Sequence, residues 1–188
     1  MKISSAGIRT ANLAGLREFY EDVLGLEAVH GDDGTLGLFA DIDLEPLVTV
    51  EEDADAAPRQ EFTTGLYHVA FLMPNRKELA RILARLSEKR YPLQGFADHG
   101  VSEAIYLADP DGNGVELYAD RPREEWPRKN GELEMFTHPL DLEGLLSEIK
   151  DNTEAVGRYS SRNDNRTHPP SGFGFVSVRP FLPRRSRL

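Results

Sequence analysis

Residues that can carry metal and acid–base chemistry gather between positions 68 and 116. His68 and Glu116 lie in two apolar runs, and His99 and Tyr106 fall between them in the sequence. Imidazole nitrogen and carboxylate oxygen together suit divalent Fe, Mn, Ni or Zn, and a site of two His and one carboxylate leaves positions open for substrate and oxygen. A second imidazole and a phenol nearby would add proton transfer and hydrogen bonding. The segment therefore indicates a divalent-metal oxygenase or isomerase site.

Strand alternation predicts that three of these side chains share one surface. Apolar residues alternate with others in three predicted strands, 66–72, 103–108 and 114–119, and successive side chains of a strand point to opposite faces. The face opposite the apolar one carries, in strand order, His68, Tyr106 and Glu116. The ordinary alternative is a half-buried strand histidine, a solvated glutamate, a core tyrosine and, in His99, a loop histidine.

Two stretches repeat the order of strand, amphipathic helix and further strands. In the first, a short strand over 3–8 precedes a helix capped by Asn12 and stopped by Gly25, and strands follow at 36–42 and 47–51. In the second, Asn75 and Glu78 form a capping-box pattern before the helix. The apolar positions of the two helices fall three and four apart, at Leu13, Leu16, Phe19, Tyr20, Val23 and Leu24, and at Leu79, Ile82, Leu83 and Leu86.

This repeat predicts an α+β fold of two paired βαβββ modules with a disordered C-terminal tail. A period of about 60 residues is the signature of a duplicated unit. The predicted division is a first module at 1–53, a linker at 54–64, a second module at 65–126, a linker with a short helix at 127–158, and a basic tail at 159–188.

Composition narrows the class of protein. The chain has 188 residues, no cysteine and a formal charge of −10, which excludes a disulfide framework or thiolate metal site and disfavours nucleic-acid binding. No apolar run is long enough for a membrane span, and the start lacks the apolar stretch of a signal peptide. We therefore expect a cytoplasmic protein that binds neither nucleic acid nor membranes.

Several motifs resemble the vicinal oxygen chelate superfamily, which includes glyoxalase I, bleomycin-resistance proteins and extradiol ring-cleaving dioxygenases. They are His68-Val-Ala-Phe, Asp98-His99-Gly100 and the run from Ile105 to Glu116, Ile-Tyr-Leu-Ala-Asp-Pro-Asp-Gly-Asn-Gly-Val-Glu. The catechol 2,3-dioxygenase-like branch is the most similar, and the resemblance covers roughly residues 3–126.

The resemblance implies a metal-holding cup formed by the paired modules. His68 and Glu116 match the metal-ligand positions, and the metal implied is Fe(II), with Mn(II) as the alternative. His99 and Tyr106 match residues that stand beside the substrate hydroxyls, which implies catalytic roles in acid–base transfer and hydrogen bonding. The implied substrates are an aromatic diol and O₂.

The sequence departs from this pattern at the first module. Ser5 stands where the family has its first metal histidine, and serine is a poor ligand. A second subunit could supply a ligand in a homodimer. Two other functions stay open: a non-catalytic module that binds a small planar ligand, as bleomycin-resistance proteins do, and a glyoxalase-type lyase with Glu51 as its carboxylate base.

Relatives in this branch are about twice as long, which predicts that the chain is the N-terminal half of a longer protein. Back-translation of residues 162–174 with the first base dropped permits a sequence similar to the opening strand of a further module. This leads to the hypothesis that the tail from 159 is a frameshift product. The plain alternative is a natural, disordered basic tail.

Overall fold

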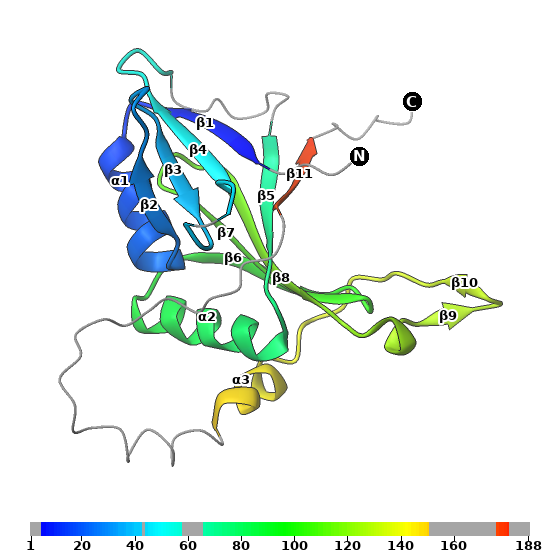
Figure 1. Ribbon diagram of the computed structural model, residues 1–188. Helices are drawn as coiled ribbons and strands as arrows, with labels where there is room; N and C mark the ends of the chain where they lie inside the picture. Colours follow the sequence, from blue (N-terminus) through cyan, green and yellow to red (C-terminus); the bar gives the residue numbers. More distant parts are fainter. Residues whose placement is uncertain (1–4, 43, 58–65, 151–175, 181–188) are drawn as a thin grey trace, which may run out of the picture.

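Two β-sheets with matching strand orders form the body of the computed structural model (Figure 1). The described residues are 5–42, 44–57, 66–150 and 176–180, the last range by its backbone alone. The sheet orders are β1-β4-β3-β2 and β5-β8-β7-β6, with β11 added beside β5. The strands are β1 (Ala6–Thr10), β2 (Glu27–His30), β3 (Leu36–Phe39), β4 (Val48–Glu52), β5 (Leu66–Leu72), β6 (Leu93–Asp98), β7 (Ser102–Ala108), β8 (Gly114–Asp120) and β11 (Val176–Pro180).

A helix follows the first strand of each module, as predicted. Helix α1 (Leu13–Glu18) continues as the π-helix η1 (Phe19–Leu24), and helix α2 spans Arg76–Glu88. Both predicted N-caps are confirmed, because the side chains of Asn12 and Asn75 accept backbone N–H bonds at 3.1 and 3.0 Å. Gly25 ends the first helix at a φ of 88°. None of the described helices is long and apolar enough to cross a membrane.

In each sheet the first and last strands of the module pair in parallel. β1 pairs with β4 and β5 with β8, while the other pairs within each module are antiparallel. This is the predicted α+β fold of two paired βαβββ modules. Within the two modules the sequence pattern missed one strand each, β2 and β6, which are the last strands of their sheets in the two orders. Their residues show no clean alternation: the β2 strand is half-exposed or exposed throughout, and β6 contains Gly95.

The two modules share one hydrophobic core. Buried side chains of both sheets and of the helices α1, η1, α2 and α3 belong to a single cluster. Tyr20 of the first module lies 6.2 Å from Phe71 of the second, measured between ring centroids. Its hydroxyl also donates a buried hydrogen bond of 3.3 Å to Asp109. The two modules therefore pack as one unit, although the sequence pattern shows them as two separate repeats.

The segment after β8 forms three small elements. A 3₁₀ turn, η2 (Arg123–Glu125), precedes the short strands β9 (Arg128–Lys129) and β10 (Glu132–Leu133). This hairpin projects away from the sheets, and α3 (Leu142–Lys150) packs against α2 (Figure 1). Residues 151–175 and 181–188, which hold most of the predicted tail, lie outside the described residues. Within that tail, β11 adds a strand that the sequence did not predict, antiparallel to β5.

The shared core predicts a large stability loss from a first-module truncation. Leu16 is 0% exposed, so Leu16→Ala should lower the free energy of unfolding by about 2–5 kcal/mol through lost burial and a residual cavity. Leu44, which is 60% exposed, gives the matched control Leu44→Ala, expected to stay within about 0.5 kcal/mol. Urea unfolding of the whole chain measures both, and equal losses would contradict the assignment of the core.

Candidate functional site

Strand register places the predicted site residues on one face of the second sheet. In the parallel β5–β8 pair, His68 lies opposite Gly114. Glu116 follows two residues later on β8, so it projects to the same face. In the antiparallel β7–β8 pair, Tyr106 lies opposite Glu116. The shared face that alternation predicts is therefore present in the structure.

The four predicted side chains form a continuous polar chain. His68 Nε2 lies 2.9 Å from Glu116 Oε2. The Tyr106 hydroxyl donates to Glu116 Oε1 at 2.9 Å and lies 2.9 Å from His99 Nε2. An imidazole, a carboxylate, a phenol and a second imidazole thus follow one another, each 2.9 Å from the next.

The His68 end of this chain is buried and incompletely satisfied. His68 is 7% exposed and Glu116 is 9% exposed. The approach of the two side chains is close, but its geometry does not make a hydrogen bond, and His68 Nε2 is a buried atom with no hydrogen-bond partner among the described residues. A buried polar group left in this state costs about 1–3 kcal/mol, which a bound cation or hydrogen-bond donor would offset.

Gly114 allows β8 to pass close to the histidine strand. A Cβ atom at this position would overlap the backbone carbonyl of Tyr67 and lie 3.0 Å from the Cβ of His68. Any larger residue would push His68 away from Glu116 or separate the two strands. A glycine inside a strand often marks such a close backbone approach, so this positioning role had a signal in the sequence that was missed.

The other end of the chain is held by a segment that sequence reasoning did not assign to the site. His99 Nδ1 lies 3.1 Å from the backbone carbonyl oxygen of Phe136 and 3.4 Å from the Thr137 hydroxyl. A main-chain carbonyl belongs to every residue type, so the identity of Phe136 gave no signal for this contact.

A charged cluster fixes the turn that carries His99. Arg121 donates to both carboxylate oxygens of Asp98, at 2.6 and 2.9 Å, and to the Gly100 carbonyl at 3.1 Å. The hydrogen bond from Arg121 holds the pKa of Asp98 below its usual value. Glu103, only 4% exposed, lies between Arg121 and Arg76, and accepts hydrogen bonds from both. Paired in this way, the buried charges orient the turn between β6 and β7.

Two side chains in the site, His68 and Glu116, are of the types that bind a divalent cation. Imidazole nitrogen and carboxylate oxygen converge at His68 and Glu116, and the unpartnered Nε2 offers a lone pair to a cation. Within the described ranges, no group of three or more His, Asp or Glu side chains could hold a metal. Ser5 Oγ is buried without a hydrogen-bond partner among these residues. The Glu51 side chain is 60% exposed and pairs with Arg9 at 3.4 Å, so it is not a buried base.

The fold and this arrangement agree with a family assignment from sequence. Residues 2–117 match the family model described as the Glyoxalase/Bleomycin resistance protein/Dioxygenase superfamily. This match spans both modules up to the residue after Glu116, and the chain belongs to this superfamily.

Curated relatives include ring-cleaving dioxygenases. The chain is 43% identical over 150 residues to Catechol-2,3-dioxygenase of Bacillus subtilis (strain 168), a match that covers 79% of this chain and 52% of the relative. It is 32% identical over 129 residues to Biphenyl-2,3-diol 1,2-dioxygenase 3 of Rhodococcus globerulus, covering 66% and 68% of the two chains. The chain thus spans about half the length of the Bacillus protein.

Solved structures agree on the fold. A glyoxalase/dioxygenase from Nostoc punctiforme superposes with a TM-score of 0.55 at 18% identity, over 64% of this chain and 92% of that one. The cppA protein of Streptococcus pneumoniae TIGR4 gives a TM-score of 0.60 at 14% identity, over 100% and 66%. At these identities the likeness concerns the fold alone.

The strand contact at Gly114 yields a prediction with a matched control. Gly114→Ala should destabilise the protein by about 1–3 kcal/mol, because the rigid Tyr67 carbonyl leaves no room for a methyl group. Gly95→Ala, also in a strand of the second sheet but with nothing within 4 Å of the added Cβ, should cost less than about 1 kcal/mol. Thermal unfolding compares the two, and an equal loss would mean that the β5–β8 contact is not tight.

Proposed function

We propose that this chain is a metal-dependent dioxygenase domain of the extradiol type, which opens aromatic diols such as catechol. The observation that carries the proposal is the continuous chain from His68 through Glu116 and Tyr106 to His99, with steps of 2.9 Å on one sheet face. The dioxygenase relatives support it, and the Bacillus protein is named for catechol.

His68 and Glu116 would hold the metal ion, Fe(II) first and Mn(II) as the alternative. Both groups are nearly buried, and a carboxylate beside a neutral imidazole favours divalent cations of this type. When bound, the cation would supply coordination positions for the two diol oxygens and for O₂. Ser5 does not complete the usual three-ligand set, so a homodimer in which a second subunit contributes a ligand belongs to the proposal.

His99 and Tyr106 would handle protons and orient the diol. The Tyr106 hydroxyl has one proton, yet it lies 2.9 Å from each of two acceptors, Glu116 Oε1 and His99 Nε2. One phenolic proton cannot serve both contacts when Glu116 is a carboxylate and His99 Nε2 carries a lone pair. In that tautomer Nε2 is an acceptor, which suits a ligand that brings hydroxyl protons. His99 would accept one of them, and Tyr106 would hydrogen-bond a substrate oxygen.

A second candidate function is binding of a small planar ligand without turnover. The observation that favours it is the incomplete ligand set among the described residues, where two metal-type side chains meet and no third joins them. The lyase alternative loses support, because Glu51 is exposed and paired with Arg9. A cytoplasmic location and the lack of nucleic-acid and membrane partners stay predictions.

Metal analysis tests whether the chain binds Fe(II) through His68. Loaded anaerobically with Fe(II), the wild-type chain should bind the ion, and His68→Ala should weaken binding by at least about tenfold, the smallest loss usual for a group that merely supports a ligand. His30→Ala, at an exposed histidine of β2, is the control and should bind like wild type. Elemental analysis and titration measure both, and full occupancy in His68→Ala would remove this histidine from the site.

Oxygen uptake in the presence of catechol tests the proposed dioxygenase activity and the roles of His99 and Tyr106. The Fe(II)-loaded chain should consume O₂ in the presence of catechol, and His99→Gln should lower kcat by about 10²–10⁴-fold, the usual contribution of a general acid or base. Tyr106→Phe should raise KM and lower kcat, because it removes a hydrogen bond at the substrate. Tight catechol binding without O₂ uptake would instead favour the binding module.

A further inference from the structure

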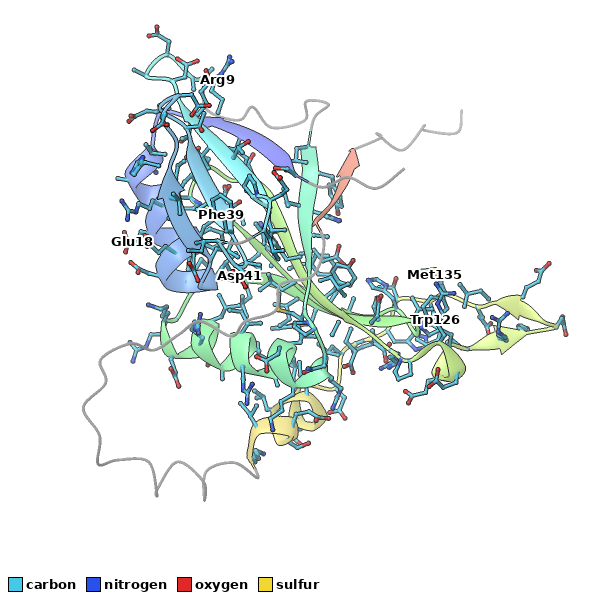
Figure 2. The ribbon with its side chains drawn as sticks, viewed as in Figure 1. Arg9, Glu18, Phe39, Asp41, Trp126 and Met135 are labelled. Carbon is cyan, nitrogen blue, oxygen red and sulfur yellow. The ribbon has the colours of Figure 1, made fainter. Side chains whose placement is uncertain are left out.

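Residues 126–138, here called the arm, lie next to the proposed acid–base histidine. The arm leaves the sheets after η2, turns through β9 and β10, and returns to the sheet edge (Figure 1). Figure 2 shows the labelled Trp126 and Met135 where the arm meets the body. The return is fixed by two backbone hydrogen bonds of 2.9 Å between Asp98 and His138. Its outward part is exposed, and its inner end reaches His99.

The inner end of the arm packs on Gly100. This glycine has a φ of +76°, and an added Cβ would lie 2.8 Å from the Phe136 ring and 2.8 Å from Pro127. The ring of Phe136 also stacks on His138 at 4.2 Å between centroids. Both ends of the arm therefore close over the residue that follows His99.

The same packing directs a backbone carbonyl at the His99 ring. The Phe136 oxygen, 3.1 Å from Nδ1, can only accept a hydrogen bond. The Thr137 hydroxyl, which can donate or accept, is farther from Nδ1, at 3.4 Å. An unprotonated Nδ1 would set its lone pair against those of the nearer Phe136 carbonyl, so Nδ1 carries the proton, and in a neutral imidazole Nε2 then keeps its lone pair. Nε2 is the atom that faces the Tyr106 hydroxyl.

We infer that the arm is a positioning element, which fixes His99 as the tautomer protonated at Nδ1 and so presents Nε2 as the acceptor in the site. Gly100 makes this packing possible, because a Cβ at its position would crowd Phe136 and Pro127 and its φ of +76° disfavours other residues. The tautomer follows from contacts of the chain alone, and its use as a base rests on the proposed dioxygenase function.

The turn around His99 contributes to the same arrangement. Asp98 accepts from the backbone N–H of Gly100 at 2.8 Å, and the backbone N–H of His99 donates to Ser102 at 2.9 Å. Trp126 Nε1 donates to the Arg121 carbonyl at 2.9 Å. This hydrogen bond connects the start of the arm to Arg121, whose side chain pairs with Asp98. The ring and the carbonyl that it faces are thus held by one connected network.

Nitrogen-15 NMR of the metal-free chain at about pH 8, where free histidine is neutral, tests the inference without turnover. His99 is identified by comparison with His99→Gln, and its long-range ¹H–¹⁵N pattern should show a protonated Nδ1 and an unprotonated Nε2. A proton on Nε2, alone or together with Nδ1, would overturn the inference. Because the metal is absent, this result is independent of whether the chain is a dioxygenase.

Two glycine variants then test the role of the arm. Gly100→Ala should displace Phe136 and lose the single tautomer, and in the Fe(II)-loaded chain it should lower kcat by about 10²-fold with little change in KM. Gly112→Ala is the matched control: its φ of +81° imposes a similar backbone strain, but nothing lies within 4 Å of the added Cβ. It should keep both the tautomer and kcat.

If Gly100→Ala does not fold, Phe136→Ala loosens the same contact without backbone strain and should also mix the tautomers. Retention of the Nδ1–H form in both variants would show that the arm does not set it. If the tautomer is found but no O₂ is consumed by the loaded wild type, the positioning inference stands and the dioxygenase proposal fails.

Discussion

The parallel pairing of β5 with β8 is the constraint on which the site depends. It places His68 opposite Gly114 and brings Glu116 onto the same face two residues later. The missing side chain at Gly114 lets the two backbones approach closely enough for Nε2 and Oε2 to lie 2.9 Å apart. β7 then adds Tyr106 directly across from Glu116. The convergence of His68, Glu116 and Tyr106 follows from this register.

One buried nitrogen of the site has no hydrogen bond among the described residues, and the surrounding structure holds it in place. This atom is His68 Nε2, which lies near the Tyr106 hydroxyl and its two contacts, Glu116 Oε1 and His99 Nε2, each at 2.9 Å. Unsatisfied groups of this kind cost stability and persist only where their surroundings hold them in place. Here one large core packs below the sheet, and the paired charges around Glu103 fix the turn beside it.

Much of this site followed from the sequence, because strand alternation is a local property. Period-two patterns were enough to put His68, Tyr106 and Glu116 on one face, and side-chain caps at Asn12 and Asn75 located both helices. The strands β2 and β6 were missed, since their residues alternate poorly at the ends of the sheets. The contact of His99 with the Phe136 carbonyl could not be found, because it joins residues 37 apart through a main-chain atom. Gly114 carried a signal, but its meaning depends on which strand lies beside it.

The single core has a consequence for how the two halves of this repeat depend on each other. Tyr20 reaches across to Phe71 and to Asp109, whose turn connects the two strands that carry Tyr106 and Glu116. The apolar faces of both repeats are buried in one shared core. The packing of the first repeat therefore supports the strands of the second that carry the site. The chemistry proposed for the second repeat therefore depends on the packing of the first, although the first contributes none of the four side chains of the polar chain.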